Sequence, residues 1–96
     1  MVEFEWDAAK AAANLTKHGV SFTEASTIFG DPLEITMPDP ARSVGEARFL
    51  SLGLSAAARL LVVAYTEREG RIRIIHARAA AAKERRTYES SRQSEP

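Results

Sequence analysis

Two β-rich runs on either side of a tight turn constrain the fold of this 96-residue chain more than any other feature. Residues 60–66 (Leu-Leu-Val-Val-Ala-Tyr-Thr) and 71–77 (Arg-Ile-Arg-Ile-Ile-His-Ala) are mostly apolar or β-branched, and Glu69-Gly70 lies between them. This pattern predicts a β-hairpin. The hairpin also carries side chains that can bind phosphate or move protons, namely Glu67, Arg68, Arg71, Arg73, His76 and Arg78.

Helix signals lie at both ends of the chain. Asp7 can cap a first helix that Gly19 is placed to end. The segment from Ser21 to Glu24 fits a capping box at the start of a second helix, which Asp31-Pro32 stops. A third helix, rich in alanine and charge, follows the hairpin. The helices are expected over residues 8–18, from residue 22 to about residue 30, and from residue 79 to about residue 90.

Strands are predicted between these helices, over residues 4–6, 33–37 and 46–54 as well as in the hairpin. A loop is expected from Pro38 to about Gly45, because two prolines so close together exclude regular structure. Since consecutive strands with short turns pair antiparallel, we expect an α+β fold. A four-stranded antiparallel sheet, plus a short N-terminal strand, would carry helices on one face and leave the other open. Residues 1–90 would form one domain, and the polar residues 91–96 a disordered tail.

The charge is zero overall but unevenly distributed. Residues 1–48 carry four basic and eight acidic side chains, whereas residues 49–96 carry nine basic and five acidic ones. This asymmetry is consistent with an anionic partner on one face, although a surface of mixed charge explains it equally well. The absence of cysteine excludes disulfides and thiol catalysis. No apolar run is long enough to span a bilayer and no signal peptide is evident, so we expect a cytoplasmic protein.

Strict alternation along residues 71–78 places Ile72, Ile74, His76 and Arg78 on one face of the sheet. If the isoleucines face the helices, Arg73 faces outward, where it could clamp a phosphate or stabilise a phosphoryl-transfer transition state. An ordinary solvated face, or a cross-strand pair with Glu67, is the alternative. His76 shares the parity of the isoleucines, and we therefore expect it in the core rather than at a site.

Other candidates surround the hairpin. Glu67 could act as a general base on a ribose 2′-hydroxyl. Lys17 and His18 end the first helix, where a cation favours the helix dipole, yet an imidazole also suits acid–base chemistry. Basic and aromatic residues of the last helix could line a substrate groove or simply be solvated; they are Lys83, Arg85, Arg86 and Tyr88. Two histidines 58 residues apart give no metal-binding cluster, so no metal or cofactor is expected.

Several segments together resemble the BrnT family of type II toxin–antitoxin systems. They are Phe4 to Asp7, Lys17 to Phe22, Phe29 to Pro32, Leu60 to Arg68, Arg71 to Ile75, Ala77-Arg78 and Glu84 to Glu89. The resemblance implies a RelE-like fold and a metal-independent ribonuclease that inhibits translation. It also implies a cognate BrnA-like antitoxin, through which any contact with DNA would be made, and no role at a membrane.

Carried over by position, the resemblance implies catalytic roles for Lys17, His18, Glu67, Arg68, Arg73 and Arg78. The expected RNA-binding residues are Arg71, Lys83, Arg85, Arg86 and Tyr88. The sequence departs from the family in its zero net charge and in Ala79 to Ala82, where related chains tend to have arginines. An attenuated toxin that only docks an acidic partner segment is therefore the alternative to an active endoribonuclease.

Overall fold

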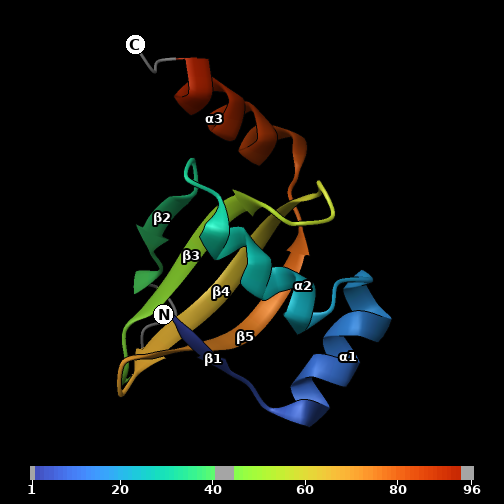
Figure 1. The fold of residues 1–96 in the computed structure, drawn as a ribbon, viewed down its shortest axis with the longest axis vertical. Helices are drawn as coiled ribbons and strands as arrows, with labels where there is room; N and C mark the ends of the chain where they lie inside the picture. Colours follow the sequence, from blue (N-terminus) through green and yellow to red (C-terminus); the bar gives the residue numbers. More distant parts are fainter. Residues whose placement is uncertain (1, 41–44, 94–96) are drawn as a thin grey trace.

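The computed structural model describes residues 2–40 and 45–93, which form an α+β fold around one five-stranded sheet (Figure 1). The strand order is β1-β5-β4-β3-β2. The short β1 lies parallel to β5, and the other neighbours are antiparallel. The strands are β1 (Glu3–Glu5), β2 (Ile35–Pro38), β3 (Arg48–Leu54), β4 (Leu60–Arg68) and β5 (Arg71–Ala79). The predicted fold class is confirmed.

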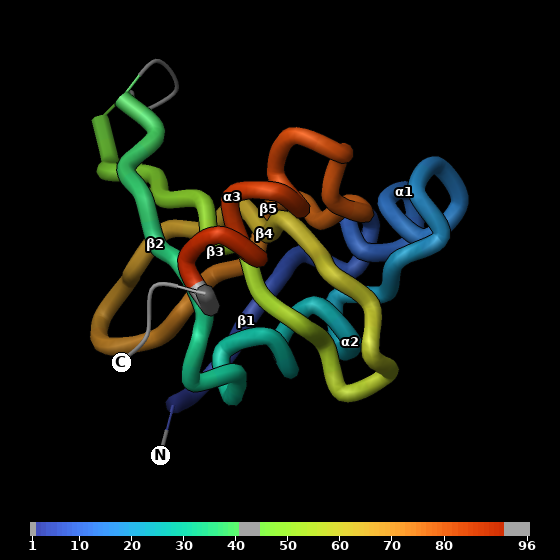
Figure 2. Tube along the Cα trace, turned by 90° about the horizontal axis from the view of Figure 1, so that it is seen from above, coloured from blue at the N-terminus to red at the C-terminus, as the bar shows by residue number. Residues whose placement is uncertain are grey.

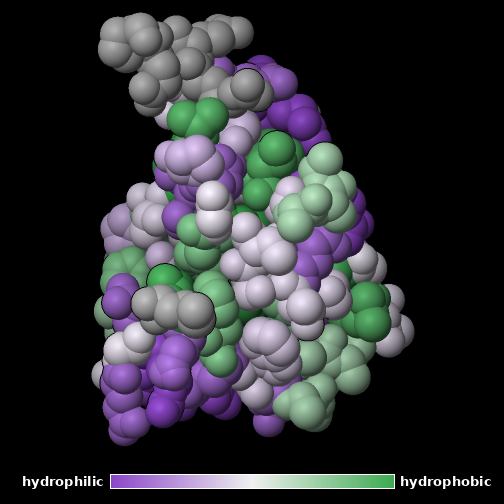
Figure 3. All heavy atoms as spheres, viewed as in Figure 1, coloured by the Kyte–Doolittle hydropathy of each residue, from purple (hydrophilic) through white to green (hydrophobic). Residues whose placement is uncertain are grey.

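The β4–β5 hairpin forms where the sequence predicts it. Glu69 and Gly70 both adopt positive φ angles, of 53° and 79°, as a two-residue turn matched to the twist of its strands requires. Both strands run two residues further than predicted, because Glu67 pairs with Ile72 and Leu61 pairs with Ala79. Hydrophilic side chains gather around this turn and β1, at the lower left of the molecule (Figure 3).

Two N-terminal helices cover one face of the sheet, as predicted. They are α1 (Ala8–His18) and α2 (Phe22–Ser26), the latter followed by a 3₁₀ turn over Thr27–Gly30. Asp7 accepts a hydrogen bond from the Lys10 amide, and Gly19 ends α1 with φ of 68°, so both predicted caps are confirmed. The apolar core joins these helices to the sheet through Val20, Phe22, Ala25, Ile28, Leu61, Val63, Ile74 and Ala77.

A buried asparagine fixes α1 against the sheet. The Asn14 amide nitrogen donates to the carbonyls of Val20 and Ala77, and its oxygen accepts from the Ala77 amide. Because β1 pairs with β5 only at residues 71–73, Asn14 satisfies the backbone of β5 further along the same edge. This places the C-terminal turn of α1, which carries His18, beside β5.

The helix α3 (Ala82–Gln93) does not join the other helices. Its Tyr88 is buried against Leu52, Leu60 and Val62, which lie on the opposite face of the sheet. The Tyr88 hydroxyl donates to Asp31 at 2.6 Å. The prediction that all helices cover one face is therefore wrong, because an apolar patch at one end of the second face also needs burial. Figure 2 shows α3 apart from α1 and α2.

The boundaries of several elements also differ from the predictions. Residue 79 belongs to β5, so α3 begins at Ala82, three residues later than expected. It continues to Gln93, into the segment predicted as a tail. Part of that segment, residues 94–96, and part of the predicted loop, residues 41–44, lie outside the described residues. Pro38, expected in the loop, ends β2.

Replacement of Asn14 tests the clamp between α1 and β5. Asn14→Leu keeps the branched shape of the side chain but leaves the buried backbone groups of Ala77 without partners. We expect the free energy of unfolding in urea to fall by roughly 2–6 kcal/mol, from two such groups at about 1–3 kcal/mol each. The control Leu15→Ala, on the exposed side of the same helix, should change it by less than about 0.5 kcal/mol. Equal stability of the two variants would show that the clamp is unimportant.

Candidate active site

A β-bulge in β5 sets which side chains reach the open face. Tyr65 pairs with Ile74 and Ala64 pairs with His76, so Ile75 is an extra residue on β5. One extra residue reverses the alternation beyond it. Ile74 and Ala77 therefore both lie in the core under the helices, whereas His76 lies on the face opposite.

The bulge overturns one prediction of the alternation pattern. His76 is not a core residue, because the extra residue moves it to the same face as Arg73 and Arg78. Strict alternation had placed Arg78 on the face opposite Arg73, with the core isoleucines. The open face thus carries three arginines (Arg71, Arg73 and Arg78) and an imidazole on a single strand.

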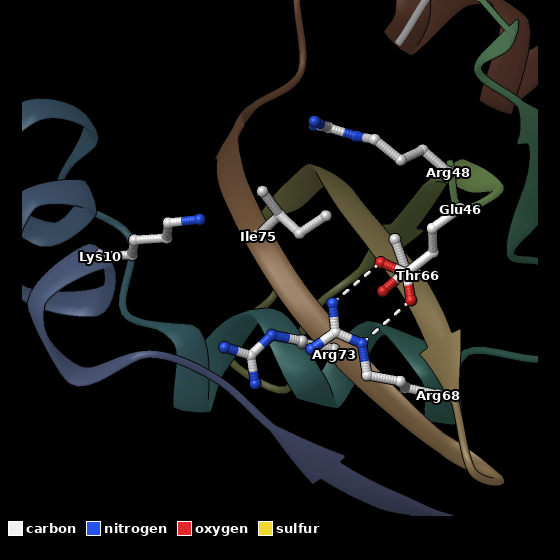
Figure 4. A pocket seen from close by; sticks show the side chains of 7 residues that line it. All are labelled: Lys10, Glu46, Arg48, Thr66, Arg68, Arg73 and Ile75. Carbon is white, nitrogen blue, oxygen red and sulfur yellow. Dashed lines mark hydrogen bonds and ion pairs between the residues drawn. The ribbon is translucent and has the colours of Figure 1, made fainter. Parts of the chain in front are cut away.

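Two adjacent hollows lie on this face. The first, here called the histidine pocket, has a volume of about 450 Å³. The second, here called the arginine pocket, has a volume of about 480 Å³ (Figure 4). Arg48 of β3 lines both, so the two pockets adjoin at this residue. The histidine pocket is lined by Lys17, His18, Asp39, Arg48, Leu50, Val62, Ala64, His76 and Arg78. The arginine pocket is lined by Lys10, Glu46, Arg48, Thr66, Arg68, Arg73 and Ile75.

Two imidazoles meet in the histidine pocket. The Nε2 atoms of His18 and His76 are 3.3 Å apart, and the rings are nearly perpendicular. Burial lowers the pKa of His76 below its usual 6.5, and nearby cationic groups, with His18 the foremost, lower it further. Since one Nε2 must donate and the other accept, a neutral His76 can accept from the N–H of His18. The pair thus presents a proton acceptor beside a proton donor.

Carboxylates outside the β4–β5 hairpin hold the arginines in place. Arg78 binds Glu84 of α3 through two hydrogen bonds, of 2.8 and 2.7 Å. The hydrogen bonds from Arg78, with help from the Ala81 amide, lower the pKa of Glu84 to about 2. Arg73 donates to Glu5 of β1 at 2.9 Å. Both oxygens of Glu46 accept from Arg68, again at 2.9 Å.

The structure brings five of the six predicted catalytic residues to the two pockets. Lys17, His18 and Arg78 line the histidine pocket, and Arg68 and Arg73 line the arginine pocket. Glu67 is the exception, since it pairs with Ile72 and so projects toward the face that the helices cover. Arg73 does form a cross-strand pair, but its partner is Glu5 of β1 and not Glu67, as the alternative had it.

The residues predicted to bind RNA are dispersed. Tyr88 is 4% exposed and belongs to the apolar cluster beneath α3, so the structure does not present it to a ligand. Lys83 lines a separate, mainly apolar groove beside Met37. Arg85 and Arg86 are exposed on α3, away from both pockets. Arg71 lies outside both pockets among Glu3, Glu5 and Glu69, at 3.6–3.8 Å.

Sequence analysis missed several lining residues, namely Lys10, Asp39, Glu46, Arg48 and Thr66. Arg48 and Thr66 face each other across β3 and β4. The alternation of Arg48 with Leu50 and Leu52 was a usable signal for its face, but only the pairing register shows that it lies beside Thr66. Across the described ranges, no helix is long and apolar enough to cross a membrane. Within the same ranges, no three His, Asp or Glu side chains gather as metal ligands.

Comparison with known proteins identifies the family. The family described as the ribonuclease toxin, BrnT, of type II toxin–antitoxin systems matches residues 6–84. The chain belongs to this BrnT family. The resemblance inferred from the sequence is therefore confirmed. Membership of a type II toxin–antitoxin family implies a protein antitoxin as partner. No protein of curated function matches the chain in sequence.

A solved BrnT structure supports the fold. The crystal structure of the Brucella abortus ribonuclease toxin BrnT, at 1.1 Å resolution, superposes with a TM-score of 0.66. The match covers 84% of this chain and 99% of that one, at 18% sequence identity. At this identity the similarity concerns the BrnT fold alone. The RelE-like designation stays a prediction.

The environment of His76 predicts how this side chain titrates. An NMR titration should give His76 a midpoint below 6.5. In His18→Gln the midpoint should rise only in part, because burial persists and cationic Lys17, Arg48 and Arg78 remain. Because the pKa of His76 is lower in the folded wild type than in the unfolded chain, the unfolded chain binds more protons just below pH 6.5. The free energy of unfolding of the wild type should therefore decrease as the pH falls through this range. A midpoint at or above 6.5 would contradict this account of the pocket.

Proposed function

We propose that this BrnT-family chain is a metal-independent endoribonuclease that inhibits translation by cleaving RNA through attack of a ribose 2′-hydroxyl. The observation that carries the proposal is the contact between His18 and His76 on an open sheet face, among Lys17, Arg48 and Arg78. An acceptor and a donor of protons beside several cations are the groups that this reaction requires without a metal.

In the proposed mechanism, substrate replaces the hydrogen bond between the two histidines. Neutral His76 removes the proton from the 2′-hydroxyl, and the 2′-oxygen attacks the adjacent phosphorus. The bond from phosphorus to the 5′-oxygen breaks, and His18, in its imidazolium form, donates a proton to that leaving oxygen. The products are a 2′,3′-cyclic phosphate and a 5′-hydroxyl. The sequence left His18 and Glu67 as candidate bases. We assign this role to His76 instead, because Glu67 projects from the other face and His18 serves as the acid.

The cations of the histidine pocket would stabilise the charge that develops on the phosphate. Arg48 reaches the boundary of both pockets from β3, and Arg78 is held by Glu84. A cation fixed before the reaction costs little reorganisation in the transition state. Lys17, exposed at the end of α1, adds a third positive charge.

We further propose a BrnA-like antitoxin as the protein partner and RNA as the substrate, in the cytoplasm. Any contact with DNA would be made through the antitoxin. Ala79 to Ala82, which depart from the family pattern, connect β5 to α3. Among them Ala80 packs against the apolar cluster of Tyr88, and the Ala81 amide donates to Glu84. Ala80 and Ala81 therefore have structural roles at the start of α3. These roles are compatible with an active toxin and with an attenuated one.

The direct test is cleavage of RNA by purified protein in EDTA. The wild-type chain should produce 2′,3′-cyclic phosphate ends. His76→Gln and His18→Gln should each lower the rate about 10²–10⁴-fold, the usual contribution of acid–base catalysis. The control Glu89→Gln changes an exposed residue of α3 outside both pockets and should cleave normally.

Three results would contradict the proposal. Loss of cleavage in EDTA with recovery by a divalent cation would reject metal independence. Full activity of His76→Gln would reject His76 as the base. A folded wild-type chain that neither cleaves RNA nor arrests growth when induced without its neighbouring gene would favour the non-catalytic binding module.

A further inference from the structure

We infer that the arginine pocket is a second phosphate subsite, which binds the RNA backbone phosphate adjacent to the one that is cleaved. The inference rests on the proposed function for its substrate, and on observations in the arginine pocket for its location. None of these observations involves the two histidines.

The first observation is a buried hydroxyl in the wall of this pocket. Thr66 is 2% exposed, and its Oγ1 has no hydrogen-bond partner among the described residues. Nearly all buried hydroxyls in folded proteins are paired, so one that lines a cavity indicates a missing polar ligand. A phosphate oxygen is an acceptor that the hydroxyl of Thr66 can satisfy.

The second observation is the charge of the lining. Lys10, Arg48, Arg68 and Arg73 come from four different elements, against a single lining carboxylate, Glu46. Lys10 forms no ion pair with the described residues. Only one guanidinium nitrogen of Arg73 has a hydrogen bond within this part of the chain, to Glu5. Figure 4 shows Lys10 and Arg48 reaching toward Ile75 from opposite sides. An anion entering here meets cations from several directions.

The lining favours a phosphate over a nucleobase. Pockets that bind bases without pairing usually offer an aromatic side chain for stacking. The arginine pocket has none, and its single large apolar residue is the bulged Ile75. The charged and hydroxyl groups that dominate the lining match the oxygens of a phosphodiester.

The spacing of the two pockets suits one strand of RNA. Ala64 of the histidine pocket and Thr66 of the arginine pocket are two residues apart on β4, about 6.6 Å along the strand. This is close to the separation of neighbouring phosphates in an extended RNA chain. With Arg48 at the boundary, one phosphate can lie beside the histidines while its neighbour lies beside Thr66 and Arg73.

The test compares substrates with one phosphate and with several. Thr66→Val and Arg73→Gln should each lower kcat/KM about 10-fold or more for a tetranucleotide, the effect of losing one hydrogen bond to a charged group. Both should cleave a dinucleotide, which has a single phosphate, as the wild type does. Matched controls are Thr16→Val, exposed on α1, and Arg59→Gln, an exposed arginine that pairs with Glu24 outside both pockets. Thr66→Val should be at least as stable as the wild type, because it removes an unpaired buried hydroxyl.

A second measurement is independent of cleavage. The affinity for a DNA oligonucleotide of the same sequence, which lacks the 2′-hydroxyl, is measured against salt concentration. The slope of log K against log salt is negative, and its magnitude should become smaller by about 0.7 in Arg73→Gln, the value for one phosphate contact on a single strand. The slope of Thr66→Val, which changes no charge, should match the wild type.

The outcomes separate this inference from the proposed function. If both variants lose equal activity on the dinucleotide and the tetranucleotide, the pocket contributes to the reaction itself and the subsite is rejected. An unchanged salt slope in Arg73→Gln also rejects it. If the wild type cleaves neither substrate, the proposed function fails, while the salt slope still decides whether the pocket binds a phosphate.

Discussion

The extra residue in β5 determines which side chains this sheet can present. A regular strand alternates strictly, so a single register would hide His76 and Arg78 beneath the helices whenever Ile72 and Ile74 face the core. Burying an imidazole and a guanidinium there without partners would be costly. The bulge at Ile75 removes the conflict, since the apolar residues on both sides of it remain in the core. Everything that lines the histidine pocket from β5 depends on this one irregularity.

The rest of the site depends on polar contacts between distant parts of the chain. Asn14 fixes the helix turn that carries His18 against the strand that carries His76. Glu84 connects Arg78 to α3, and Glu5 connects Arg73 to β1. The position of α3 at one end of the second face leaves the remainder of that face uncovered. The site is thus assembled by the tertiary structure, although most of its arginines lie within one hairpin.

Local signals in the sequence predicted most of the fold. The caps at Asp7, Gly19 and Ser21 and the turn at Glu69-Gly70 depend on nearby residues, and each forms as predicted. The placement of α3 could not be predicted this way. In the sequence Tyr88 is an isolated aromatic residue in a polar helix, and only its contacts with Leu52 and Val62 show which face of the sheet α3 covers. The face of His76 was missed for a similar reason, since a bulge has no signature in the alternation of Arg-Ile-Arg-Ile-Ile-His. The resemblance to BrnT proteins identified five pocket residues that periodicity alone did not bring together.

The internal carboxylates of the site have a consequence for selectivity. Three arginines that an anion would approach are already paired with Glu5, Glu46 and Glu84. An incoming phosphate must therefore compete with a carboxylate of the protein for each of these arginines. A free nucleotide could compensate for the loss of only one such pair and would gain little. Under the proposed function, a polymer would engage cations of the histidine pocket and the arginine pocket at once, and its gains would accumulate over a single association event. The paired arginines would thereby bind the abundant small phosphates of a cell weakly and would favour long polynucleotide strands.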